Sequence, residues 1–141
     1  MTFQHIIVPY EGGALSEDAL RIACHLVFNE SRITAVYVVE IPKDMPVGAE
    51  KPREEAAREA LERAEAVGRE LGVKVETYVA KAPAVADGVN ETAATLKADA
   101  IVMSLRRKHR REETMFLSHN ASRILRHAPC HVVITYHHDE D

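Results

Sequence analysis

Short runs of apolar, mostly β-branched residues alternate along this chain with segments whose apolar residues recur at helical spacing. The clearest run, residues 33–39, is apolar almost throughout, which is typical of a parallel strand covered on both faces. The clearest helical segment, residues 52–71, places its alanines, leucines and valines on one side and several Glu–Arg pairs on the other. This alternation predicts an α/β fold with a parallel sheet and right-handed crossovers.

The whole pattern contains five strand signals and four helix signals, so we expect an open five-stranded parallel sheet in the order 3-2-1-4-5, with helices on both faces. We expect residues 1–136 to form a single domain and residues 137–141 to be a disordered tail. Ser16 is the expected N-cap of the first helix. The expected strands cover residues 3–9, 33–39, 73–79, 100–103 and 131–136, and the later helices cover residues 52–71, 83–96 and 118–127.

Composition excludes several classes of protein. The chain has 141 residues, of which 46% are hydrophobic and 28% charged, as in a soluble globular domain. Its net charge of −4 argues against general binding of nucleic acid, which needs a basic face. No apolar run approaches the roughly 20 residues of a membrane span, and the N-terminus lacks the pattern of a signal peptide. We therefore expect a cytoplasmic protein.

The sequence offers no pattern typical of catalysis or metal binding. Cys24 and Cys130 have no metal or redox spacing, and both are interpreted as small buried hydrophobic residues. The eight histidines show no recognised ligand spacing with an acidic partner, so no metal site is predicted. There is no G-x-S-x-G motif either. A binding or regulatory role is favoured over an enzyme.

A ligand site is expected where the strand order reverses, beyond the carboxyl ends of the first and fourth strands. Two loops would line it, residues 10–13 and residues 104–117. In the first loop, Gly12 and Gly13 suit a tight turn, because glycine tolerates positive φ. Glu11 either belongs only to that turn or contacts a ligand.

The second loop carries five formal positive charges within residues 106–111. Three interpretations remain open. The run is a solvated loop balanced by Glu112 and Glu113, as charge runs usually are. Alternatively, its cations bind an anion such as phosphate. In the third interpretation the loop docks an acidic partner.

Three segments carry a resemblance to a known family: I-I-V-P at residues 6–9, A-D-A-I-V-M at residues 98–103, and S-R-I-L-R-H-A-P-C-H-V-V-I-T at residues 122–135. Together they resemble the universal stress protein family. The resemblance implies a small cytoplasmic protein, usually a homodimer that pairs through its last strand, here residues 131–136. Some members bind ATP or AMP, and the family's nucleotide-contacting Asp corresponds to Glu11.

The chain departs from the family pattern at the phosphate loop, which reads G-x-x-G, nine residues, then Gly-Ser/Thr. No glycine occurs after Gly88. Counting back from Ser118, the two earlier glycines fall at Leu105 and Lys108, or at Ser104 and Arg107 after a shift of one residue. His119 takes the Ser/Thr position, while Ser118 and Asn120 are also natural N-caps of the last helix.

The expected function is therefore a homodimeric binding or regulatory module with weak or absent ATP binding, because a basic loop replaces the glycine loop. The alternative is an ATP- or AMP-binding protein, with slow hydrolysis, that uses Glu11 and the loop over residues 106–111. The candidate residues of the nucleotide or anion crevice are Pro9, Tyr10, Glu11, Val39, Met103, Ser104, Arg107, Lys108, Ser118, His119 and Asn120.

Overall fold

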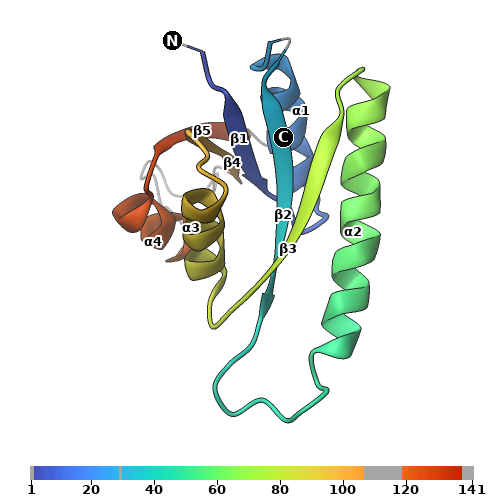
Figure 1. Ribbon diagram of the computed structural model, residues 1–141, viewed down its shortest axis with the longest axis vertical. Coiled ribbons are helices and arrows are strands. Elements are labelled where there is room, and N and C mark those ends of the chain that lie inside the picture. The colour runs from blue at the N-terminus through green and yellow to red at the C-terminus, as the bar shows by residue number, and fades with distance from the viewer. Residues whose placement is uncertain (1, 29, 107–118, 138–141) are drawn as a thin grey trace.

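The computed structural model describes residues 2–28, 30–106 and 119–137. Five parallel strands form one sheet in the order β3-β2-β1-β4-β5, so the predicted fold class and strand order are confirmed (Figure 1). The strands are β1 His5–Pro9, β2 Arg32–Glu40, β3 Val75–Ala82, β4 Ala100–Arg106 and β5 His131–His137. The helices are α1 Ala14–His25, α2 Lys51–Glu70, α3 Val85–Thr95 and α4 His119–His127.

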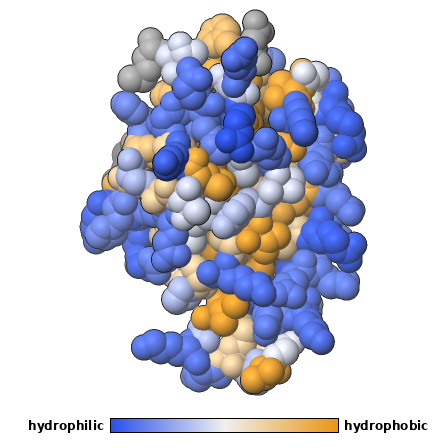
Figure 2. All heavy atoms as spheres, in the orientation of Figure 1, coloured by the Kyte–Doolittle hydropathy of each residue, from blue (hydrophilic) through white to orange (hydrophobic). Residues whose placement is uncertain are grey.

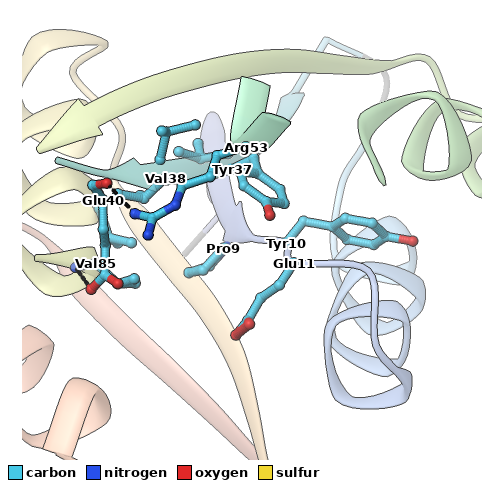
Figure 3. Close-up of a pocket in the computed structure, with 11 residues that line it drawn as sticks. Pro9, Tyr10, Glu11, Tyr37, Val38, Glu40, Arg53 and Val85 are labelled. Carbon is cyan, nitrogen blue, oxygen red and sulfur yellow. Dashed lines mark hydrogen bonds between the residues drawn. The ribbon is translucent and has the colours of Figure 1, made fainter. Parts of the chain in front are cut away.

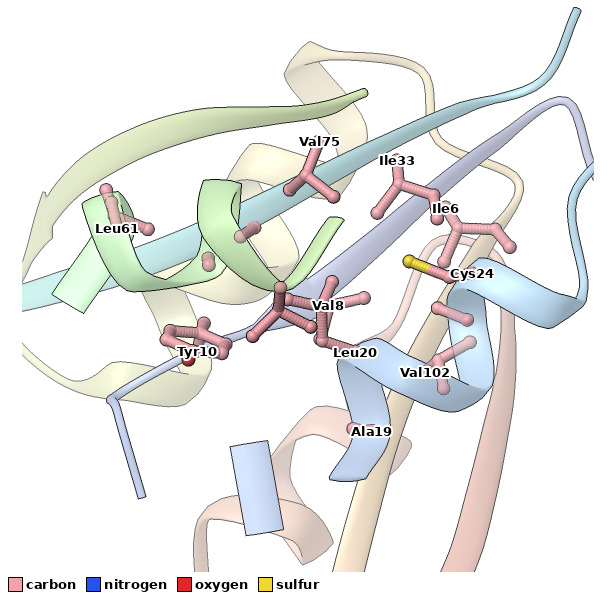
Figure 4. Close-up of a cluster of buried hydrophobic side chains, with 14 of the residues drawn as sticks. Ile6, Val8, Tyr10, Ala19, Leu20, Cys24, Ile33, Leu61, Val75 and Val102 are labelled. Carbon is pink, nitrogen blue, oxygen red and sulfur yellow. The ribbon is translucent and has the colours of Figure 1, made fainter. Parts of the chain in front are cut away.

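Helices cover both faces of the sheet, α1 and α2 on one face and α3 and α4 on the other (Figure 1). The central strand β1 shows why its sequence is apolar without alternation. Successive side chains of a strand point to opposite faces, so Ile6 and Val8 pack under α1 and α2 while Ile7 packs under α3 and α4. All three are fully buried, and Figure 4 shows Val8 beside Leu20 and Ile6 beside Cys24, with Leu20 and Cys24 both on α1.

The start of α1 differs from the sequence-based expectation. The helix begins at Ala14 with Gly13 as its N-cap, so the prediction of Ser16 as the N-cap is wrong. The Ser16 hydroxyl instead accepts a hydrogen bond from the backbone N–H of Glu11 at 3.0 Å. This bond, together with a φ of 101° at Gly12, forms the tight turn that leads out of β1.

Two helices approach the sheet more closely than a side chain would allow. In α2, a Cβ added to Gly68 would lie 2.4 Å from Cγ2 of Val75 and 2.6 Å from the backbone oxygen of Val73. In α3, a Cβ added to Gly88 would lie 2.7 Å from Cγ1 of Val38 on β2. Glycine is therefore a packing requirement at both positions.

The loop over residues 41–50 joins β2 to α2 and extends beyond the carboxyl end of the sheet (Figure 1). Apolar atoms gather at this lower tip of the molecule (Figure 2), and the side chain of Val47 is fully exposed. Turn hydrogen bonds from Met45 N–H to the Pro42 oxygen and from Ala49 N–H to the Pro46 oxygen shape the loop, each 3.1 Å long.

A buried histidine lies at the amino ends of the strands, opposite this loop. His5 at the start of β1 is 5% exposed, and its Nε2 lies 2.8 Å from the Thr34 hydroxyl on β2. Burial of the ring and then the nearby Arg32 guanidinium lower the pKa of His5, and the opposing influence of Glu76 and Asp99 is smaller. The fold therefore favours the neutral imidazole.

We expect the free energy of unfolding to fall as pH drops below about 6.5, the ordinary pKa of histidine. In that range the unfolded state binds a proton at His5 that the folded state resists, so protonation favours unfolding. The free energy of unfolding continues to fall as the pH is lowered, until the pH reaches the pKa of His5 in the folded state. Urea unfolding between pH 8 and pH 5 measures this effect, and His5→Asn should have a shallower pH slope than the unmodified protein. An unchanged slope would contradict the prediction.

Candidate functional site

A cavity of about 320 Å³ opens at the carboxyl ends of β1 and β2, beside the first turns of α3 (Figure 3). This is the end of a parallel sheet where ligands of such folds bind. The lining residues come from β1, β2, the turn after β1, α2 and α3. They are Pro9, Tyr10, Glu11, Val36, Tyr37, Val38, Val39, Glu40, Arg53, Val85 and Val89.

One side of the cavity is a wall of valines from β2 and α3. Val36 and Val89 belong to the core under α3 and α4 and are almost fully buried, so packing holds them in place. Val39 is equally buried but follows Val38 on β2, so its side chain points to the other face of the sheet. Two further valines, Val38 and Val85, are half-buried and extend the wall toward the opening. An apolar wall of this kind suits the face of a planar or hydrophobic ligand.

Charged side chains occupy the rim of the cavity. Arg53, in the first turn of α2, reaches across to donate from Nη1 to the backbone oxygen of Glu40 at 2.7 Å. The Glu40 carboxylate accepts a hydrogen bond from the backbone N–H of Val85 at 3.3 Å, at the N-terminus of α3. The carboxylate of Glu11 extends into the opening from the other side (Figure 3). The rim can therefore accept and donate hydrogen bonds.

Helix α3 is held against α4 by polar contacts on its other side. The Arg123 guanidinium of α4 pairs with the Asp87 carboxylate at 3.0 Å, and the Asn90 side-chain amide donates to the Ile124 backbone oxygen at 3.4 Å. These contacts position the helix that carries Val85 and Val89.

Tyr10 lies at the cavity through its backbone and not through its ring. The ring is 1% exposed and points away from the opening, into the core beneath α1 and α2 (Figures 3 and 4). Its hydroxyl has no hydrogen-bond partner among the described residues. Burial, followed by the charge of Glu17, raises the pKa of Tyr10, so the phenol stays protonated. Its backbone N–H donates to the Val36 oxygen at 2.8 Å and joins the ends of β1 and β2.

Four of the predicted site residues, Pro9, Tyr10, Glu11 and Val39, therefore line the same cavity. Met103 does not line the cavity, and its side chain packs in the core under α3 and α4.

The other predicted residues lie away from the cavity or beyond the described residues. Ser104 lies at the end of β4, with its hydroxyl 2.5 Å from the Thr135 hydroxyl and 3.2 Å from the Asp18 carboxylate. His119 and Asn120 are exposed at the start of α4. Arg107, Lys108 and Ser118 lie outside the described residues, as does most of the basic loop.

The sequence-based prediction missed seven lining residues: Val36, Tyr37, Val38, Glu40, Arg53, Val85 and Val89. Glu40 could have been predicted, because it directly follows the apolar run of β2. Ligands of such folds bind just beyond the carboxyl ends of the parallel strands. Arg53 and the two valines of α3 could not have been predicted in this way. Their role depends on how α2 and α3 pack against the sheet, which no local pattern encodes.

The described lining lacks the residues that most often act as activated nucleophiles. Among the cavity residues that the structure describes there is no Ser, Cys, Lys or His that could act as a nucleophile beside a base. The described part of the chain also contains no group of three or more His, Cys, Asp or Glu side chains that could hold a metal ion. None of its helices is both long and apolar enough to span a membrane.

The amino-acid sequence matches the model of one protein family over nearly its whole length. The model of the universal stress protein family matches residues 2–135, nearly the whole chain. The chain belongs to the universal stress protein family. This assignment agrees with the parallel sheet in the order 3-2-1-4-5, and it confirms the resemblance recognised in the sequence. None of the curated protein sequences compared with the chain matches it significantly.

Solved structures of other universal stress proteins share the fold. The chain is similar to a family protein from Burkholderia pseudomallei, with 27% identity, a TM-score of 0.68, and coverage of 93% of this chain and 94% of that one. It is similar to UspA from Lactobacillus plantarum, with 18% identity, a TM-score of 0.71, and coverage of 96% and 99%. A third relative, from Archaeoglobus fulgidus, is in complex with dAMP and shows 15% identity, a TM-score of 0.70, and coverage of 92% and 94%.

Proposed function

We propose that this universal stress protein is a cytoplasmic regulatory module whose cavity holds the base of an adenine nucleoside, with weak or absent affinity for ATP. The observation that supports this proposal is the cavity itself. Its valine wall and polar rim lie at the strand ends where Pro9, Glu11 and Val39 come together. A volume of about 320 Å³ suits a base with its sugar rather than a whole triphosphate.

The phosphate groups lack the usual means of recognition. Glycine-rich loops bind phosphates through closely approaching backbone N–H groups, and this chain has no glycine after Gly88. Two carboxylates at the rim, those of Glu11 and Glu40, add charge of the same sign as a phosphate. Both features favour the nucleoside part of the ligand over its phosphates.

Isothermal titration with adenosine, AMP and ATP tests this function. We expect ATP to bind at least about threefold more weakly than adenosine at moderate salt, because the phosphates gain no favourable contact and are repelled by the carboxylates of Glu11 and Glu40. Salt should change the ATP constant only slightly. An ATP constant at least about tenfold lower than that of adenosine would contradict the proposal.

That outcome would support the second candidate function, in which the basic loop over residues 106–111 binds the phosphates and Glu11 helps to position them. The observation in its favour is that β4 ends at Arg106 and α4 begins at His119, so the loop leaves the sheet at the same edge as the cavity. In that case Arg107→Ala should weaken ATP more than adenosine, and slow ATP hydrolysis should be measured. If only an acidic protein partner responds to this variant, the loop is a docking site.

We also propose that the protein forms a homodimer through β5, over residues 131–136. β5 is an edge strand that pairs only with β4 within the described chain. Its apolar residues Val132, Val133 and Ile134 are half-buried. An uncovered apolar edge invites pairing with another strand, and a second copy of β5 would satisfy it.

Replacing Val133 with lysine tests the dimer. We expect analytical ultracentrifugation at micromolar concentration to show a dimer for the unmodified protein and a monomer for Val133→Lys, because a charge on an edge strand opposes pairing. Val79→Lys is the matched control, since Val79 lies on β3 at the other edge and is 42% exposed. A monomeric unmodified protein would refute the dimer, as would dissociation caused by Val79→Lys alone.

A further inference from the structure

The cavity rim places a hydrogen-bond acceptor and a hydrogen-bond donor side by side. Arg53 is anchored by one hydrogen bond, from Nη1 to the Glu40 backbone oxygen. Glu40 is anchored by its Oε2, which accepts from Val85 N–H. Each anchor uses only part of the side chain's capacity, because a guanidinium has five N–H donors and a carboxylate has two acceptor oxygens.

The remaining capacity is directed to the cavity. Oε1 of Glu40 makes no hydrogen bond within the described part of the chain, and both side chains line the opening (Figure 3). Because one side chain belongs to β2 and the other to α2, the Arg53–Glu40 bond also sets the distance between them. The pair therefore forms a donor beside an acceptor at the edge of the valine wall.

The charges around the cavity favour a ligand that brings donors rather than anions. The lining contains the two carboxylates of Glu11 and Glu40 against the single guanidinium of Arg53, so negative charge is in excess. A carboxylate accepts strongly from an N–H group and is repelled by a carbonyl oxygen. A planar ring lying on the valine wall would present its polar edge to this pair.

We propose that Glu40 and Arg53 determine specificity by reading the edge of an aminated heteroaromatic ring. The ring's amino group donates to Oε1 of Glu40, and the neighbouring ring nitrogen accepts from the Arg53 guanidinium. This inference rests on the proposed function, since it concerns the same cavity. It assigns recognition to two side chains that are not among the candidate residues predicted from the sequence.

The experiment titrates three nucleosides against the unmodified protein, Glu40→Gln and Arg53→Met. Adenosine carries the amino group, purine riboside lacks it, and inosine replaces it with a carbonyl oxygen. In Glu40→Gln the side-chain oxygen would still accept from Val85 N–H, but the amide group would turn a donor toward the ligand. We expect Glu40→Gln to raise the dissociation constant of adenosine about tenfold to a hundredfold. The dissociation constant of purine riboside should stay unchanged, and that of inosine should fall.

Arg53→Met should act differently, because it removes the donor to the ring nitrogen that both ligands share. We expect it to weaken adenosine and purine riboside by the same factor, about tenfold. Glu55→Gln and Arg58→Met are the matched controls, since these two side chains pair with each other on the exposed side of α2 at 3.6 Å and line no part of this cavity. They should leave all three dissociation constants unchanged.

The outcomes separate the two proposals. If Glu40→Gln changes the affinities for adenosine and purine riboside by the same factor, or changes neither, recognition of the amino group by Glu40 is refuted. The proposed nucleoside function would still stand. If no nucleoside saturates the unmodified protein, the proposed function fails and this inference fails with it. Thermal unfolding of each variant checks that all remain folded, which the exposed position of both side chains leads us to expect.

Discussion

Gly68→Ala is expected to lower the free energy of unfolding by about 2–3 kcal/mol. Inside a helix the same substitution normally stabilises a protein by up to about 1 kcal/mol, because alanine is the better helix former. Here the added methyl group would lie 2.6 Å from the backbone oxygen of Val73 and 2.4 Å from a methyl group of Val75. Backbone cannot move aside as a flexible side chain can, so α2 must shift away from β3.

Urea unfolding measures this loss, with Gly13→Ala as the control. Gly13 has no atom within 4 Å of an added Cβ, so its replacement causes no clash and should cost only about 0.5–1 kcal/mol, through the loss of a favourable N-cap residue. Combining Gly68→Ala with Val75→Ala should not restore stability, because the clash with the Val73 oxygen remains. Equal stability of Gly68→Ala and the unmodified protein would show that α2 adjusts its position freely.

Gly88→Ala is expected to lower the free energy of unfolding by about 1–3 kcal/mol and to weaken adenosine binding as well. The added methyl group would lie 2.7 and 2.8 Å from the two γ-carbons of Val38, and 3.3 Å from Cβ of Ala82. Val38 is β-branched and has little rotamer freedom, so α3 must move. That movement separates Val85 and Val89 from β2, which changes the width of the cavity.

Circular dichroism and isothermal titration measure the two effects separately. Val38→Ala in the Gly88→Ala background should recover part of the stability, since it removes both clashing methyl groups. Binding should recover less, because the valine wall then lacks one member. Loss of stability with unchanged affinity for adenosine would mean that the cavity does not depend on the position of α3.

The strand order could be predicted because the information is local. Buried parallel strands need nearly continuous apolar runs, as in residues 33–39, and a parallel sheet with alternating helices leaves few topologies. Element ends were harder. Ser16 has the chemistry of an N-cap, yet its hydroxyl serves the turn at Glu11 instead. Both uses of a serine are local and similar in energy, so the sequence does not decide between them.

The candidate site could be predicted only where it follows the strands. Pro9, Glu11 and Val39 come at or just beyond the carboxyl ends of strands, where ligands of such folds bind, and the structure brings them to the lining of one cavity. Tyr10 shows the limit of this prediction, because a strand end locates a residue but does not say which way the side chain points. Arg53 was not predictable, since its contact with Glu40 depends on the path of the long loop between them.

That loop, residues 41–50, is a suitable place for a fluorescent reporter of ligand binding. Its ends are clasped by the hydrogen bond between Arg53 and the Glu40 oxygen, while its tip at Val47 is solvated. Lengthening a loop costs little free energy, roughly 0.6 kcal/mol for each doubling. A fluorescent peptide inserted beside Val47 would therefore be tolerated. Its emission should change when a ligand binds, because Glu40 and Arg53 both close the loop and line the cavity.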